Sequence, residues 1–392
     1  MGEFADAHWA RRPLLSPGAD DFTDLLSPEA VDELVSTRGV RTPFLRMAKQ
    51  GSVLDAKRFT RSGGAGAEIA DQVADDKVLA EFADGATLVL QGLHRLWPPL
   101  VGFGGQLAAD LGHPVQINAY VTPPSNRGFD AHYDVHDVFV LQVSGEKRWM
   151  IHAPVHADPL RDQPWQEHRA AVAARATEPP VIDTVLRPGD ALYLPRGWLH
   201  SAEALGDTSI HLTVGVHATT RYALVEALLA IAADTPELRA SLPLGVDVGD
   251  PEQVAAELKS TVDALVERLG AASAAEVATR LRRRHWNATR PEPIRPLAQA
   301  AVAATADAGT TVRRRGHLRY TLDRRGEEEV LRLPDRILTL PPGCHDAVTA
   351  LLDGGTHRAG ALPGLAPEDS VVLVRRLLRE AVVVPVPAES TA

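Results

Sequence analysis

The stretch FDAHYDVHDVFVLQVSGEKRWMIH, residues 129–152, decides the fold and holds most of the residues suited to chemistry. Within it, His132 and Asp134 flank a single residue. Side chains two residues apart point to the same face of a strand, so both can reach one ion. His136 continues the alternation, and we expect it beside such a metal site or at the surface. The pattern alone also fits ordinary polar residues at a strand end.

A second half of a metal site is present at RPGDALYLPRGWLH, residues 187–200, which ends on His200. The Pro-Gly-Asp sequence predicts a turn, ALYLP a buried strand, and the last residues a loop leading to the histidine. Two histidines and one carboxylate on one side of a cation form the facial triad of non-haem Fe(II) oxygenases. Zinc favours more nitrogen or sulfur ligands, and calcium and magnesium favour more oxygens. The two motifs therefore predict an iron site made of His132, Asp134 and His200.

An iron site of this kind needs an electron source to activate dioxygen, and 2-oxoglutarate, the usual one, needs a cation for its distal carboxylate. Lys147 offers that cation on the second strand of a hairpin, whose turn we place at Ser144 and Gly145. Lys147 shares a strand face with Trp149 and Ile151, and this face is expected to be buried. The opposite face carries the more polar set, Arg148, Met150 and His152. A buried lysine requires an anion. The alternative is an exposed lysine with the other face buried.

Length and composition limit the class of protein. The chain has 392 residues, which predicts two or three domains. No apolar run is long enough to span a membrane, the N-terminus lacks a signal-peptide core, and Cys344 is the only cysteine, so a cytoplasmic location is expected. The net charge of −10 argues against general affinity for nucleic acid and is compatible with a basic partner.

The pattern along the chain changes twice. Residues 115–217 contain short β-rich segments between turn residues, which predicts a sandwich or barrel of two small sheets. Residues 221–286 are helical and either form a dimer interface or pack onto their own domain. Beyond residue 291, a β-hairpin and short helices resemble a winged helix. Winged helices often bind DNA, but no clearly basic recognition helix is present here, so direct DNA binding is not expected.

Three motifs together resemble the JmjC ribosomal oxygenases, which are Fe(II)- and 2-oxoglutarate-dependent protein hydroxylases. They are INAYVTPPSNRGFDAHYDVHDVFVLQVSGEKRW, RPGDALYLPRGWLH and SIHLTVGV, at residues 117–149, 187–200 and 209–216. The resemblance implies an α+β fold with a double-stranded β-helix (JmjC/cupin) core. It also implies three domains: a catalytic domain at 1–220, a helical dimerisation region at 221–290 and a winged-helix-like domain at 291–392.

The resemblance also assigns roles to single residues. His132, Asp134 and His200 match the iron ligands, and Lys147 matches the residue that pairs with the 2-oxoglutarate carboxylate. Asn118 and Tyr120 match residues that line the cofactor and substrate pocket in the histidine-hydroxylating branch, and Thr213 lies near a hydroxyl that contacts 2-oxoglutarate, with His211 on the same face. The candidates for shaping the substrate groove are Arg127, Trp198 and the acidic residues around Asp130.

The implied activity is hydroxylation of a histidine or arginine side chain of a ribosomal protein by Fe(II), 2-oxoglutarate and O2. The substrate is then a protein or peptide, a basic ribosomal protein being expected, and the enzyme is a homodimer. Three alternatives keep the metal site. The same chemistry can act on a biosynthetic precursor peptide or remove methyl groups, the triad can serve a small-molecule isomerase or dioxygenase, or the protein can be a non-catalytic metal-binding cupin regulator.

Overall fold

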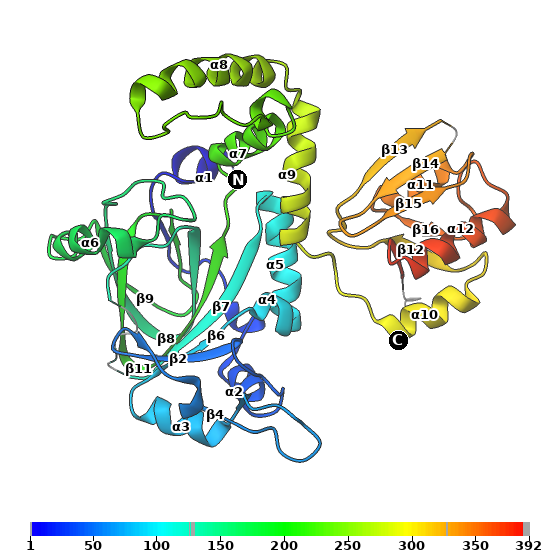
Figure 1. Ribbon diagram of the computed structural model, residues 1–392. Coiled ribbons are helices and arrows are strands. Elements are labelled where there is room, and N and C mark those ends of the chain that lie inside the picture. The colour runs from blue at the N-terminus through cyan, green and yellow to red at the C-terminus, as the bar shows by residue number, and fades with distance from the viewer. Residues whose placement is uncertain (1, 125, 127–129, 327, 387–392) are drawn as a thin grey trace. The chain divides into compact units, whose positions relative to one another are not determined.

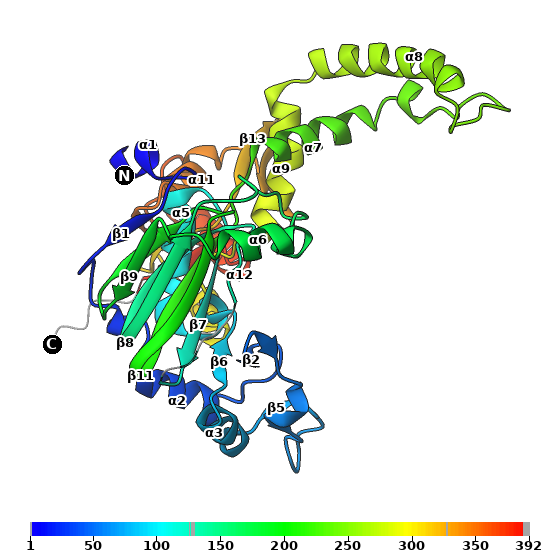
Figure 2. The same ribbon diagram turned by 90° about the vertical axis from the view of Figure 1, so that its left-hand side faces the viewer.

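The computed structural model describes residues 2–124, 126, 130–326 and 328–386 (Figures 1 and 2). The chain divides into two compact units, Met1–Ala218 and Thr219–Ala392. Within the described residues, no helix combines the length and the apolar character needed to cross a membrane. The three functional domains expected from the sequence stay predictions.

The first unit begins with short elements that precede the main strands. They are α1 (Gly2–Ala7), β1 (Leu14–Ser16), η1 (Phe22–Asp24), α2 (Pro28–Ser36), β2 (Leu45–Lys49), β3 (Ser52–Val53), η2 (Ala56–Arg58), β4 (Thr60–Arg61), β5 (Gln72–Val73), α3 (Asp75–Ala83), β6 (Thr87–Leu90), α4 (Leu93–Leu96) and α5 (Pro98–Leu111). Helix α2 begins at Pro28, and the Ser27 side chain caps it by accepting from the Ala30 amide. Helix α5 ends at Gly112, whose φ of +70° suits a left-handed cap.

One nine-stranded sheet organises the first unit. Its later strands are β7 (Val115–Thr122), β8 (Asp137–His152), β9 (Ile182–Leu186), β10 (Ala191–Leu194) and β11 (Leu199–Val216), with η3 (Trp165–His168) and α6 (Arg169–Arg175) between β8 and β9. The strand order is β1-β10-β8-β11-β7-β6-β2-β3, and β9 also pairs with β8. Figure 2 shows β9, β8, β11 and β7 side by side. The first half of β8 pairs with β10 and the second half with β9, while β11 pairs with both halves.

The predicted hairpin at Ser144 and Gly145 is wrong. Strand β8 runs without reversal from Asp137 to His152, and β11 runs from Leu199 to Val216. Gly145 has a φ of +63° and lies at a register shift between β8 and β11. A Cβ atom there would collide with the backbone carbonyl of Thr208. The glycine therefore permits a bulge in a long strand instead of a turn, because pairing with β11 continues on both sides of it.

Apolar side chains cover both faces of this sheet. The larger cluster joins the β6, β7 and β11 side chains to those of α2 and α5, and includes Leu34, Leu88, Leu100, Ile117 and Leu212. A second cluster gathers side chains of β8, β9 and β10 around Trp149, including Val140, Ile151, Leu186 and Leu194. The strands that lead to the candidate site are therefore fixed by packing on both sides.

The second unit contains a helical segment followed by a mixed segment. The helical elements are α7 (Arg221–Ala232), η4 (Glu237–Arg239), α8 (Pro251–Gly270) and α9 (Ala274–Ala288), and α7 contacts both α8 and α9. The mixed segment contains α10 (Pro296–Thr305), β12 (Thr311–Arg314), β13 (Thr321–Arg325), β14 (Glu328–Arg332), β15 (Ile337–Leu340), α11 (His345–Leu352), β16 (Thr356–Arg358), α12 (Pro367–Arg379) and β17 (Val383–Pro385). Its two three-stranded sheets, β16-β12-β17 and β13-β14-β15, contribute to one apolar core with α11 and α12. The hairpin expected in this segment is formed by β13 and β14.

Candidate metal centre

The structure brings together three residues that the sequence separates. The ligand atoms of His132, Asp134 and His200 all lie within 4.8 Å of one another. His200 is on β11, whereas the other two lie just before β8. Backbone hydrogen bonds join the two parts: the His200 amide donates to the His132 carbonyl at 2.8 Å, and the His132 amide donates back at 3.2 Å. The cluster is therefore held by main-chain pairing, before any side-chain contact is counted.

The two imidazole rings are oriented by their own backbone neighbourhood. The His132 Nδ1 lies 2.7 Å from the Asp130 carbonyl, and the His200 Nδ1 lies 3.1 Å from the Trp198 carbonyl. A carbonyl oxygen only accepts, so Nδ1 carries the proton in both rings. The remaining nitrogen, Nε2, is then the lone-pair donor, which is the usual arrangement of metal-binding histidines. The His200 Nε2 lies 3.7 Å from a carboxylate oxygen of Asp134.

The protonation states suit a cation. Burial lowers the pKa of His200 to about 4, so this ring is neutral at physiological pH. Burial alone would raise the pKa of Asp134, but the surrounding histidines outweigh it and the pKa is lowered. Two imidazoles and one carboxylate on one side of a cation fit a non-haem Fe(II) centre with open coordination positions. His136 lies outside this group, where its ring packs 5.2 Å from that of His217.

Lys147 is buried close to this cluster. Only 3% of the residue is exposed, and its Nζ donates to the Thr122 hydroxyl at 3.0 Å. Burial lowers its pKa to about 7. Among the described residues, no carboxylate forms an ion pair with it. A lysine buried without a carboxylate is the environment that an incoming anion would complete.

The strand faces around Lys147 largely follow the sequence prediction. Trp149 and Ile151 are buried beside it, and Arg148 on the other face is exposed. His152 is the exception: it is buried, and its ring bonds the Glu178 carbonyl at 3.1 Å. Glu178 belongs to the connection between α6 and β9, and this connection covers the end of strand β8. The burial of His152 therefore could not be foreseen from alternation alone.

Aromatic rings connect Lys147 with the metal cluster. The indole of Trp149 lies 6.0 Å from His200 and 5.4 Å from His211. His211 in turn stacks on Tyr120 with ring centroids 5.1 Å apart and an angle of 4°. Burial, with the nearby charge of Lys147, lowers the pKa of His211 well below its usual value. Largely apolar aromatic rings thus lie near both the lysine and the triad.

The other predicted pocket residues lie on neighbouring strands. Asn118 pairs with Thr213, and Tyr120 with His211, across β7 and β11. The Asn118 side-chain oxygen accepts from the Gly92 amide at 3.0 Å, so one of its polar atoms holds the start of α4. Tyr120 accepts a hydrogen bond from the Arg46 guanidinium, and burial raises the pKa of its phenol.

Two of the candidates for shaping the substrate groove, Asp130 and Trp198, lie within the described residues. The carboxylate of Asp130 faces Gly51 in the turn after β2, and Trp198 holds His200 through its carbonyl. Arg127 lies outside the described residues.

Sequence reasoning missed three features of the site. Thr122 has a signal in the sequence, because it continues the alternation of Asn118 and Tyr120 along β7. Arg46 on the remote strand β2 has none. The third feature is a buried carboxylate, Asp137, which accepts from the Arg196 amide at 3.1 Å and from the Tyr193 hydroxyl at 3.2 Å.

Comparison with known proteins identifies the domain. The model of the JmjC domain matches residues 106–224, which include the metal cluster, Lys147 and the β7–β11 pairing. This segment is similar to a JmjC domain. The resemblance to the JmjC ribosomal oxygenases drawn from the motifs is confirmed by its relatives and its fold.

Two curated relatives illustrate the similarity. The bifunctional lysine-specific demethylase and histidyl-hydroxylase NO66 of Drosophila pseudoobscura pseudoobscura is 40% identical over 255 residues, which are 63% of this chain and 26% of that protein. Ribosomal oxygenase 1 of Gallus gallus is 28% identical over 251 residues, which are 62% of this chain and 40% of that protein. This chain thus matches less than half the length of these relatives.

Solved structures support the fold. YcfD, a ribosomal oxygenase from Escherichia coli solved in complex with cobalt and 2-oxoglutarate, has a TM-score of 0.53 and 18% identity, with 98% of each chain covered. A second YcfD structure, with a TM-score of 0.54 and 17% identity, covers the same shares. The predicted cupin-type α+β fold is confirmed.

Proposed function

We propose that this chain is an Fe(II)- and 2-oxoglutarate-dependent peptidyl hydroxylase that acts on a side chain of a ribosomal protein. The observation that carries the proposal is a cluster of His132, Asp134 and His200 with a buried lysine nearby, both on the same JmjC domain. When bound, Fe(II) would supply the redox chemistry by which O2 and 2-oxoglutarate yield succinate, carbon dioxide and a hydroxylated carbon.

The triad would hold the iron and leave open positions for 2-oxoglutarate and O2. The backbone bridge between His132 and His200, together with the carbonyl partners of both Nδ1 atoms, orients both rings with Nε2 as the lone-pair donor. The carboxylate of Asp134 is already ionised, so no proton must leave it.

Lys147 would orient 2-oxoglutarate by pairing with its distal carboxylate. Thr122 holds the lysine Nζ at 3.0 Å and can donate its own hydroxyl proton to the same carboxylate. The neighbouring Trp149 and His211 exclude water from the pair, which strengthens a charge-assisted bond. Asn118, Tyr120 and Thr213 are proposed to line the same pocket from β7 and β11.

The proposed substrate is a basic ribosomal protein, modified on histidine or arginine. The relatives' names include a histidyl-hydroxylase and a ribosomal oxygenase, and the resemblance of Lys147 and the NAYVTPP stretch to the histidine-hydroxylating branch supports a histidine target. The net charge of −10 favours encounter with a basic protein. A cytoplasmic location stays a prediction.

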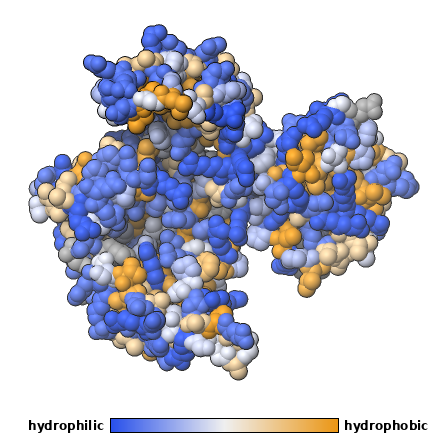
Figure 3. Space-filling view, in the orientation of Figure 1, coloured by the Kyte–Doolittle hydropathy of each residue, from blue (hydrophilic) through white to orange (hydrophobic). Residues whose placement is uncertain are grey.

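A homodimer formed through residues 221–290 is part of the proposal. No residue of α8 is buried, yet Leu258, Val262 and Val266 repeat every four residues and are 56%, 44% and 63% exposed. Side chains four apart lie on one helix face, so they form an apolar stripe that a partner would cover. Apolar patches are visible on the helical segment at the top of Figure 3. The proposal also includes a winged-helix-like domain at 291–392, for which direct DNA binding is not expected.

The test is turnover of 2-oxoglutarate by the purified chain with Fe(II) under air. We expect succinate to form and His132→Ala to abolish its formation. The matched control is His156→Ala, which changes another histidine of the same unit outside the metal cluster. Undiminished succinate production by His132→Ala would refute the assignment of the metal site.

A further inference from the structure

An apolar groove lies on the face of the sheet opposite the metal centre. Leu88 of β6, Val121 of β7 and Ile210 of β11 form its floor. Val121 follows Tyr120 in the sequence, and Ile210 precedes His211, two residues near the metal centre. Because side chains alternate along a strand, Val121 and Ile210 point to the opposite face of the sheet. The groove has a volume of about 550 Å³, which is in the range of ligand sites.

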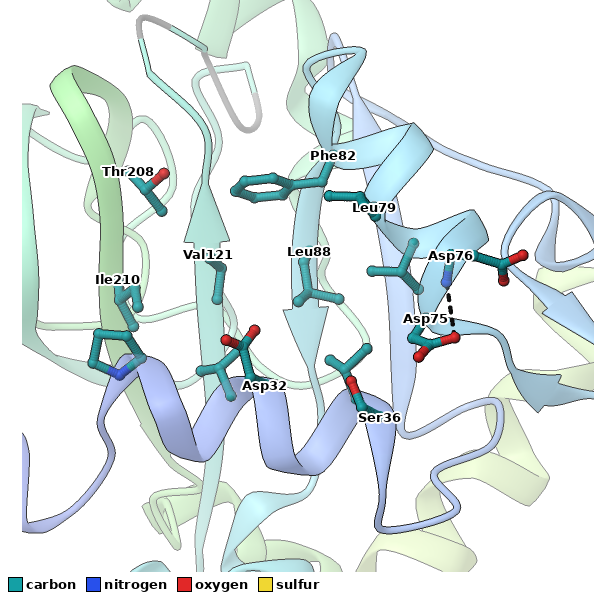
Figure 4. Close-up of a pocket in the computed structure, with 14 residues that line it drawn as sticks. Asp32, Ser36, Asp75, Asp76, Leu79, Phe82, Leu88, Val121, Thr208 and Ile210 are labelled. Carbon is teal, nitrogen blue, oxygen red and sulfur yellow. Dashed lines mark hydrogen bonds between the residues drawn. The ribbon is translucent and has the colours of Figure 1, made fainter.

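Two helices wall the groove. Helix α2 contributes Val31 and Val35, and α3 contributes Val78, Leu79 and Phe82. Figure 4 shows Phe82, Leu79 and Leu88 directed into the groove above α2. Leu79 is 68% exposed, so a large apolar side chain faces water in the free protein. Covering it would remove apolar surface from water.

The rim of the groove is acidic. Asp32, Asp75 and Asp76 line it, together with Ser36 and Thr208, and none of the lysines, arginines and histidines that the structure describes does. Asp76 is paired with Arg61. Among the described residues, no ion pair joins Asp32 or Asp75 to a basic side chain. An occupant with apolar groups flanked by positive charge would complement both features.

We propose that this groove docks a basic, amphipathic segment of the protein substrate, outside the residue that is modified. The inference rests on the proposed function, because the docked protein is the one whose target side chain enters the metal centre on the other face. Two attachment points raise the effective concentration of the second once the first is engaged. A second copy of this chain is a poor occupant, since its net charge of −10 would meet the acidic rim.

Binding can be measured without any substrate. The probe is a fluorescein-labelled synthetic peptide with leucines at helical spacing and lysines elsewhere, followed by fluorescence anisotropy. We expect Leu79→Asp and Asp32→Lys each to weaken binding at least about tenfold, a change of about 1.4 kcal/mol. The matched control is Val181→Asp, which adds the same charge at a position 60% exposed that does not line the groove. Equal affinity in all three variants and the parent would overturn the proposal.

A kinetic arm separates this inference from the proposed function. With ribosomal proteins as substrate, Leu79→Asp should raise the apparent KM about tenfold and leave kcat and substrate-free 2-oxoglutarate turnover unchanged. If the parent chain does not turn over 2-oxoglutarate, the proposed hydroxylase activity is refuted. Peptide binding alone then tests whether the groove is a docking site. An unchanged KM with normal turnover would refute substrate docking. Loss of a dimer in Leu79→Asp, seen by sedimentation, would assign the groove to a second copy and likewise overturn the proposal.

Discussion

The ammonium of Lys147 and the hydroxyl of Thr122 lie 3.0 Å apart in the interior of the first unit. The two residues come from different strands, β8 and β7, which do not pair with each other but both pair with β11. A buried lysine held by a neutral hydroxyl is an incomplete electrostatic environment. The carboxylate of 2-oxoglutarate would complete it.

Replacing Lys147 should therefore weaken the use of 2-oxoglutarate. We expect Lys147→Met to raise the KM for 2-oxoglutarate about 100-fold, since loss of one partner of a buried charge pair costs about 2–5 kcal/mol. Lys147→Arg should retain part of the affinity because it keeps the charge. Titration of 2-oxoglutarate against succinate formation measures this, and an unchanged KM in Lys147→Met would remove the lysine from the site.

The same lysine predicts a pH dependence. Its pKa of about 7 means that it is charged below this pH and neutral above it. Binding of the carboxylate needs the charged form, so the KM for 2-oxoglutarate should rise about tenfold between about pH 6 and about pH 8. His200, with a pKa of about 4, stays neutral throughout this range. Lys147→Arg is the control, because its profile should be flat; a flat profile in the parent chain would contradict the prediction.

Gly145 should be required for the long strand β8. Its φ is +63°, and a Cβ atom would collide with the Thr208 carbonyl. We expect Gly145→Ala to lower the free energy of unfolding by about 3 kcal/mol, combining backbone strain with a steric clash. Gly206→Ala is a matched control: its φ is +65°, but nothing lies within 4 Å of the added atom, so about 1 kcal/mol is expected. Denaturant unfolding measures both variants. If they lose the same free energy of unfolding, the close approach of Gly145 to the Thr208 carbonyl has no energetic cost.

Asp137 should depend on its partners for stability. It is fully buried, burial raises the pKa of its carboxyl, and Arg196 lies 3.7 Å from it as a side-chain partner. Arg196→Met should destabilise the protein by about 3–5 kcal/mol because it leaves a buried charge unpaired. The double variant with Asp137→Asn should recover most of the loss. Denaturant unfolding of the parent chain and the two variants is the measurement, and a double variant no more stable than Arg196→Met would refute the pairing.

The apolar stripe on α8 predicts a dimer that one substitution can disrupt. Val262→Lys places a charge in the middle of the stripe, so we expect sedimentation to show a shift from dimer to monomer. Lys259→Glu, on the same helix but with a side chain 82% exposed and outside the stripe, should leave the dimer intact. A parent chain that sediments as a monomer would contradict the dimer proposal itself.

The metal cluster could be predicted because its signal is local. His132 and Asp134 are two residues apart, and RPGDALYLPRGWLH brings His200 to a strand end; strand alternation then fixes which side chains meet. The buried face of Lys147 followed from the same rule. The bridge that pairs His200 with His132 is the one part of the cluster that alternation does not reveal.

The features that escaped prediction depend on long-range pairing. The composition of Ser144-Gly145 suits either a turn or a bulge. A bulge forms because β8 pairs on both sides of it with β11, some 60 residues further along the chain. Arg46 reaches Tyr120 only because β2, β6 and β7 are neighbours in the sheet, an order that periodicity does not reveal. Thr122 was within reach of alternation along β7.

The most direct test of the hydroxylase uses ribosomal proteins from a strain of the source organism that lacks this gene. They are incubated with the purified chain, Fe(II), 2-oxoglutarate and air, and their intact masses are measured. The account predicts that one protein gains the mass of one oxygen atom, that fragmentation places it on a histidine or arginine, and that His132→Ala gives no gain. Consumption of 2-oxoglutarate with no mass change in any ribosomal protein would contradict the proposed substrate.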